Sequence, residues 1–179
     1  MKIAIAYGLF EGPLCGRILR KELRQRGHSI VGIKNADILI LHSGAWLMMD
    51  KYPTDKRILL IDPAYQTTQS VLTKSVRRIQ YDLRHLRPLQ YPGYLLRRSY
   101  NLWYFITKLP YWIEMLENYR SKDISSLLRQ KHVHLFEASD PAWHDTVVTN
   151  RAANAIVELP GDHDALWHTP RLTADILGL

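Results

Sequence analysis

The chain has 179 residues, 46% of them hydrophobic and 23% charged, which fits one soluble globular domain with enough residues to bury a core. Its single cysteine, Cys15, excludes an internal disulfide and a cysteine-based zinc site. The net charge of +7 comes from residues 70–108, which hold eight basic residues and one acidic residue, while the remainder of the chain is neutral.

The apolar stretches of the chain are short. The N-terminal run MKIAIAY is interrupted at Gly8, too early for a signal peptide. No window reaches the roughly 20 apolar residues that a membrane-spanning helix needs. The sequence therefore predicts a soluble protein in the cytoplasm, where a lone thiol stays reduced.

The first third of the chain predicts alternating strands and helices. Residues 2–7 form a short apolar run, and residues 14–26 carry leucine and isoleucine on one helical face and basic residues on the others. Residues 28–33 are strand-like, but the four residue steps to the next strand span at most about 14 Å, so only a stub is expected there. Buried strands are expected at residues 37–41 and 57–61, with a short helix between them.

The middle of the chain changes pattern. Residues 66–130 contain no strand-like run. Helical spacing of apolar residues appears over 71–86 and again over 102–116, with Pro110 as a predicted break. These residues therefore predict a helical insertion.

The strand pattern then resumes at residues 133–137 and 155–159, and a terminal helix is expected at 170–177. We therefore expect an α/β fold with a mostly parallel sheet of about five strands flanked by helices. It divides into a core of residues 1–65 and 131–179 and a helical lid insertion of residues 66–130, all within one structural domain.

Polar residues follow the predicted strands. In open parallel α/β sheets, ligand sites form outside the carboxyl ends of the strands. The residues expected there are Gly8 and Leu9, Ser43 and Gly44, Asp62, Asp140, and Asp162 and His163. A serine hydroxyl is a weak nucleophile unless a base takes its proton, and that base needs a carboxylate to orient it. This set of residues therefore favours acyl transfer by a serine.

The order serine, aspartate, histidine after successive strands resembles the α/β-hydrolase superfamily. LHSGA stands where that family has its nucleophile turn, SDPAW resembles its acid loop, LPGDHDALWHTP its histidine loop and YGLFEGP its oxyanion loop. The helical insertion stands where many members carry a lid. The resemblance covers essentially the whole chain, from the family's third strand onward, and is closest to small single-domain bacterial serine hydrolases.

The resemblance implies a catalytic triad of Ser43 as nucleophile, His163 as general base and Asp140 as acid. The backbone N–H groups of Leu9 and Gly44 would form the oxyanion hole. Such a site hydrolyses an ester or a related acyl bond through an acyl-enzyme, with an esterase favoured over an amidase or peptidase. It needs neither a metal nor an organic cofactor.

Several residues have more than one interpretation. Asp62 is the alternative acid, since some family members place the acid one strand earlier, but it also suits an ordinary turn. His144 and Trp103 are candidates for the substrate pocket. Leu41 stands two residues before Ser43, where the family usually has glycine, and so predicts either a slightly different turn or a looser one.

Ser43 has a structural alternative, which is to cap the following helix. His42 is predicted to pack or to fix a loop rather than to act as a base. The alternative function for the whole chain is a non-catalytic protein of the same fold, whose basic insertion binds an acidic partner such as nucleic acid or an anionic membrane surface. Aromatic and arginine residues alternate at residues 97–100, but no nucleic-acid-binding motif accompanies them.

Overall fold

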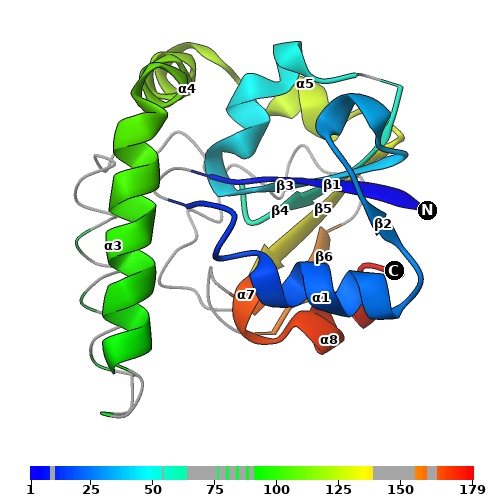
Figure 1. Ribbon diagram of the computed structural model, residues 1–179. Coiled ribbons are helices and arrows are strands. Elements are labelled where there is room, and N and C mark those ends of the chain that lie inside the picture. The colour runs from blue at the N-terminus through cyan, green and yellow to red at the C-terminus, as the bar shows by residue number, and fades with distance from the viewer. Residues whose placement is uncertain are drawn as a thin grey trace.

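The computed structural model describes most of the chain, namely residues 1–8, 11–53, 55–63, 91–138, 156–160 and 165–179, with the single positions 76, 80, 84 and 88. Within these residues one sheet is built from β1 (Lys2–Ala6), β2 (Ser29–Ile30), β3 (Ile38–His42), β4 (Arg57–Ile61), β5 (Val133–Ala138) and β6 (Ile156–Leu159). All neighbouring strands pair in parallel, in the order β2-β1-β3-β4-β5-β6 (Figure 1). The predicted α/β class is therefore confirmed.

The described sheet has six strands rather than about five. The additional strand is β2, which arises from the predicted stub and lies at the edge of the sheet beside β1. Ser29 N–H donates to the carbonyl of Met1 and Val31 N–H to that of Ile3, both at 3.0 Å. The strand stays short because the chain turns almost at once into a 3-10 helix, η1 (Ile33–Asn35), on its way to β3.

The central strands are apolar because both faces of the sheet are covered. All five residues of β3 and the last four of β4 are buried. Continuous apolar runs of this kind are typical of strands in parallel sheets that have helices on both sides. The strands predicted at residues 37–41 and 57–61 are confirmed with boundaries shifted by at most one residue.

The helices of the described residues are α1 (Arg17–Gln25), the 3-10 helix η2 (Ser43–Lys51), α3 (Tyr91–Thr107), α4 (Leu109–Ser121), α5 (Ser125–Leu128), α7 (Ala165–His168) and α8 (Pro170–Ile176). Pro110 and Pro170 lie in the first turns of α4 and α8, where the missing N–H costs no helical hydrogen bond. The break predicted at Pro110 is thus the boundary between α3 and α4.

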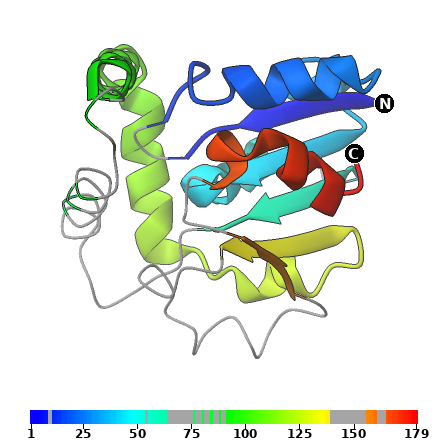
Figure 2. The same ribbon diagram turned by 90° about the horizontal axis from the view of Figure 1, so that it is seen from below.

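The helices form a layer on each face of the sheet. On one face α1, α7 and α8 pack through Leu19, Leu23, Leu166 and Trp167 (Figures 1 and 2). On the other face η2, α4 and α5 contribute to a second apolar cluster. The chain leads from β1 to α1 in one layer and from β3 to η2 in the other. The two loops at the carboxyl ends of these strands therefore leave the sheet on opposite sides.

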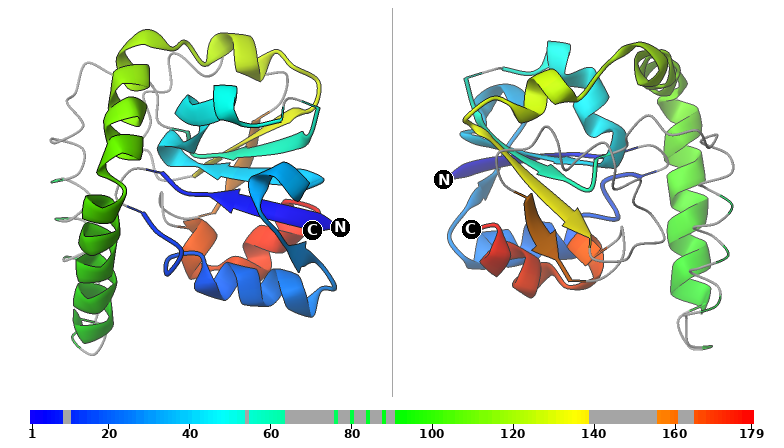
Figure 3. Two further views of the ribbon diagram at one scale, coloured as in Figure 1. Left: turned by 45° about the horizontal axis from the view of Figure 1, so that its top comes forward. Right: turned by 180° about the vertical axis from the view of Figure 1, so that it is seen from behind.

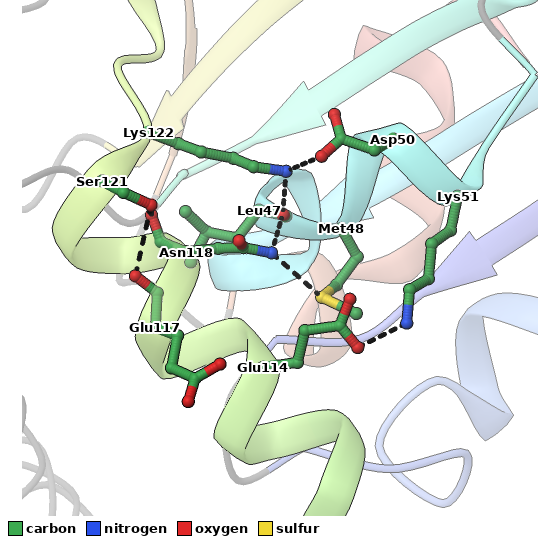
Figure 4. Close-up of polar contacts among 9 residues, drawn as sticks. All are labelled: Leu47, Met48, Asp50, Lys51, Glu114, Glu117, Asn118, Ser121 and Lys122. Atoms are coloured by element: carbon green, nitrogen blue, oxygen red, sulfur yellow. Dashed lines mark hydrogen bonds and ion pairs between the residues drawn. The ribbon is translucent and has the colours of Figure 1, made fainter.

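Helix α4 is part of the core. Its residues Trp112 and Met115 are buried in the same cluster as η2. Asn118 Nδ2 and Lys122 Nζ both donate to the carbonyl of Leu47 in η2, at 2.9 and 3.0 Å (Figure 4). Ion pairs between Lys122 and Asp50 and between Lys51 and Glu114 join the same two helices. Helix α4, in the second half of the predicted insertion, is therefore fixed to η2 by hydrogen bonds and ion pairs and to the core by buried packing.

Helix α3 stands beside the end of the sheet to which β1 points (Figure 3). It contacts the segment between β1 and α1, where Asn101 Nδ2 donates to Cys15 Sγ at 3.3 Å. A Cβ atom added at Gly12 would lie 3.1 Å from the ring of Tyr104, so the backbone and the helix are in close contact. Among the described residues, no helix combines the length and the apolar character needed to cross a bilayer.

Candidate functional site

The topology singles out the carboxyl ends of β1 and β3. The order of the strands reverses there, because β2 lies on one side of β1 and β3 lies on the other. The chain leaves β1 toward α1 on one face of the sheet and leaves β3 toward η2 on the opposite face. Ligand sites of open α/β sheets form at such a reversal point. Gly8 and Ser43 are the residues that lie there.

Ser43 has a left-handed backbone. It follows β3 directly, and its φ of 53° makes it one of two described non-glycine residues with positive φ, the other being Asp62. This conformation costs an L-residue about 1–2 kcal/mol and is found where the surrounding structure imposes it, often at functional sites. The residue is 9% exposed. A strained turn thus holds the hydroxyl at the carboxyl edge of the sheet.

Leu41 is compatible with this turn. Its side chain is 1% exposed and belongs to the core cluster that also contains Ala6 and Leu60, its partners on β1 and β4. The leucine therefore points into the apolar layer, and the reversal of the chain is taken up one residue past His42. Leucine at this position is thus found together with a left-handed φ at Ser43.

Gly8 brings the loop after β1 against the serine. A Cβ atom at Gly8 would lie 2.5 Å from Ser43 Cβ, 2.9 Å from Ser43 Oγ and 3.0 Å from the backbone nitrogen of Gly44. No side chain fits at such distances, so only glycine allows this approach. The backbone of the first loop, the hydroxyl of Ser43 and the N–H of Gly44 are consequently in one place.

Replacing Gly8 by alanine is expected to lower the free energy of unfolding by about 1–3 kcal/mol, because the added methyl overlaps Ser43 in a packed site. Gly32→Ala is the matched control, since nothing lies within 4 Å of a Cβ there, and it should be neutral or stabilising by up to about 1 kcal/mol. Urea denaturation of both variants measures the difference. Equal stabilities would contradict the close contact.

Glu11 and His42 form a buried acid–imidazole pair next to the contact between Gly8 and Ser43. Glu11 and His42 are 1% and 0% exposed, and Glu11 Oε2 is 2.7 Å from His42 Nδ1. The same carboxylate oxygen accepts the N–H of Gly8 at 2.9 Å. The prediction that His42 fixes a loop is confirmed by these contacts. Glu11 was not predicted, since its partner lies 31 residues away and no local pattern connects them.

Two further acidic residues lie at the same edge. The register pairs His42 with Ile61, so Asp62 and Ser43 follow side by side on β4 and β3. Asp62 is 5% exposed and its N–H donates to the carbonyl of Phe136 at 2.7 Å. Glu137, the next residue of β5, is also buried. Asp62, the alternative acid, is thus next to the serine in the sheet.

Tyr7 anchors the start of the first loop. Its hydroxyl accepts a hydrogen bond from Arg20, and its ring lies 5.8 Å from that of Trp167. Burial raises the pKa of Tyr7 to about 12, although the guanidinium of Arg20 opposes the shift. The phenol therefore remains neutral at physiological pH and keeps its hydrogen atom.

The other predicted site residues are either exposed or outside the described part of the chain. Trp103 is on α3 and is 61% exposed, on the side of the helix opposite the buried Asn101. Leu9, Asp140, His144 and His163 lie outside the described residues. In the part of the chain that the structure describes, no three histidine, cysteine or acidic side chains are arranged to hold a metal ion.

No protein-family model, curated protein or solved structure matches this chain. Function is therefore inferred from the geometry at Gly8, Glu11, His42 and Ser43, together with the order of polar residues along the sequence.

Proposed function

We propose that the chain is a serine hydrolase of α/β-hydrolase type in which Ser43 is the nucleophile. The observation that carries the proposal is the left-handed turn at Ser43, formed directly after a buried parallel strand and contacted by the backbone of Gly8. A strained strand-to-helix turn exposes a nucleophilic serine at the top of such sheets. A serine that only capped η2 would need no such strain, and the N-cap position of η2 is occupied by His42.

The proposed mechanism uses a histidine that follows the last strand. His163 takes the proton of Ser43 Oγ while the oxygen attacks the substrate carbonyl, and Asp140 orients the imidazole and stabilises its charged form. The backbone N–H groups of Gly44 and Leu9 bind the developing oxyanion, each with an effect of roughly 3 kcal/mol on the barrier. His163 then protonates the leaving group, and water activated by the same histidine hydrolyses the acyl-enzyme.

The proposed substrate is an ester or a related acyl compound, and the proposed location is the cytoplasm. Helix α3 contacts the loop that follows β1, which supports a covering role for the first half of the insertion. Helix α4 is held to η2 by buried side chains and hydrogen bonds, so it acts as a fixed wall.

A fluorophosphonate probe tests the proposal. We expect covalent labelling of the folded wild-type protein at Ser43 and none in Ser43→Ala. Ser125→Ala, at the start of α5, is the matched control and should label like the wild type. Folded wild-type protein that remains unlabelled would rule out Ser43 as an activated nucleophile.

A second candidate function is binding of an acidic partner without catalysis. It is favoured by the face of α3 that points away from the segment between β1 and α1, where Leu95, Leu96, Leu102, Trp103 and Ile106 are between 57% and 70% exposed. This helix lies in the stretch that carries the whole net charge of the chain. Absence of labelling combined with salt-sensitive binding to a polyanion would favour this function.

A further inference from the structure

Two hydrogen bonds join Gly8 and Glu11 across the turn after β1. Glu11 N–H donates to the carbonyl of Gly8 at 3.2 Å, and Gly8 N–H donates to Glu11 Oε2 at 2.9 Å. Glu11 therefore bonds both the carbonyl and the N–H of Gly8. These two hydrogen bonds fix Gly8 relative to Glu11.

The same carboxylate connects this turn to β3. Glu11 Oε2 lies 2.7 Å from Nδ1 of His42, the residue immediately before Ser43. The imidazole is itself held in place, because it is fully buried and its ring makes an edge contact with Trp167 at 5.1 Å between centroids. One hydrogen atom between Oε2 and Nδ1 therefore joins the two side chains, and which atom donates depends on the tautomer of the imidazole and the protonation of the carboxyl group.

We propose that Glu11 is a positioning residue, which, by bridging Gly8 N–H and His42 Nδ1, holds the loop after β1 at the distance from Ser43 that catalysis requires. This role rests on the proposed function of Ser43. A buried carboxylate and imidazole are costly to desolvate, and a well-packed apolar pair of similar size is often no less stable. What the pair does provide is a fixed position of Gly8 relative to His42 and hence to Ser43. Such a position matters because displacement by about 1 Å at a catalytic site can cost about 100-fold in rate.

Glu11→Gln tests this role with little change of volume. The amide has one oxygen that accepts and one nitrogen that only donates, so it does not reproduce the bonding of a carboxyl group to both Gly8 N–H and His42 Nδ1. We expect kcat for p-nitrophenyl acetate to fall about 10- to 100-fold and KM to stay within about twofold, because the turn acts on the transition state. Active-site titration with a fluorophosphonate expresses kcat per reactive serine, so a loss of folded protein alone leaves this value unchanged.

Glu22→Gln is the matched control. Glu22 lies on α1 and pairs with Arg26 at 2.9 Å, away from the carboxyl edge of the sheet. It should leave kcat unchanged.

Two replacements of His42 provide an independent test. His42→Leu removes the nitrogen and should lower kcat as Glu11→Gln does, whereas His42→Asn offers an amide N–H at a comparable position and should lower it less. The double variant Glu11→Gln/His42→Leu should lose no more than the worse single variant, because both changes break one bridge.

The outcomes are distinguishable. If the wild type is labelled at Ser43 and Glu11→Gln has the wild-type kcat per titrated site, the positioning role is overturned and the hydrolase remains. If the wild type is not labelled at all, the proposed function fails and the positioning role fails with it.

Discussion

Replacing His163 by alanine is expected to lower kcat for p-nitrophenyl acetate by at least about 10⁴-fold, as much as replacing Ser43 by alanine. The reason is that the serine oxygen is unreactive at neutral pH without a base, and His163 is the base in the proposed mechanism. The double variant Ser43→Ala/His163→Ala should be no worse than either single variant, because the two groups act as one unit.

The control for this prediction is His28→Ala, which should retain wild-type activity. His28 precedes β2, at the opposite end of the strands from Ser43. Steady-state kinetics on folded protein, checked by circular dichroism, gives the comparison. Normal activity in His163→Ala would assign the base to another residue and would remove the histidine loop from the proposed mechanism.

The same assay separates the two candidate acids. Asp140→Asn should lower kcat about 10⁴-fold, since an amide leaves the imidazole in the wrong tautomer, whereas Asp62→Asn should lower it less than about 10-fold. Asparagine tolerates the left-handed backbone of Asp62, whose φ is 40°, so this replacement does not strain the turn. The reverse result would identify Asp62 as the acid, with its place beside Ser43 in the register as the structural reason.

The second large effect concerns stability. Trp112→Ala is expected to lower the free energy of unfolding by about 3–5 kcal/mol, because the indole is 1% exposed in the core cluster. Its ring packs against Phe105 and Tyr111, with centroids 5.9 and 5.0 Å away. Removing it leaves a cavity between α4 and the sheet.

Trp103→Ala is the matched control on the neighbouring helix. Its side chain is 61% exposed, so truncation should change the free energy of unfolding by no more than about 0.5 kcal/mol. Guanidinium denaturation with an unchanged slope for both variants makes the comparison direct. A loss below about 1 kcal/mol for Trp112→Ala would show that α4 is a detachable cover and not part of the core.

The elements of the fold were largely predictable from local pattern. Short apolar runs identified β3 and β4, and Pro110 identified the junction between α3 and α4. The short connection into β3 correctly limited the preceding strand to a stub. Such features depend on residues that are close in the sequence, through side-chain period, proline geometry and the reach of the chain. The pattern did not reveal that the stub forms a hydrogen-bonded sixth strand, since this depends on its contacts with β1.

The candidate site was only partly predictable. Ser43 was located by its place after an apolar run, and His42 was expected to pack or to fix a loop because neighbouring strand residues point to opposite sides. Glu11 was missed because its role arises from a contact with a residue on another strand. The apolar stripe of the insertion was expected to pack onto the core, and Trp112 does so, whereas Trp103 of the same stripe is exposed.

The turn at Ser43 separates what the sequence determined from what only the tertiary structure decided. The sequence by itself determined that a serine follows a buried strand and that small residues come next. It did not determine the backbone of that serine, and Leu41 suggested either a slightly different turn or a looser one. Only the tertiary structure decided the matter: Leu41 is packed between β1 and β4, His42 is held by Glu11, and Gly8 occupies the space beside Ser43. A left-handed φ is unfavourable on its own, so it forms only where contacts from several distant segments impose it.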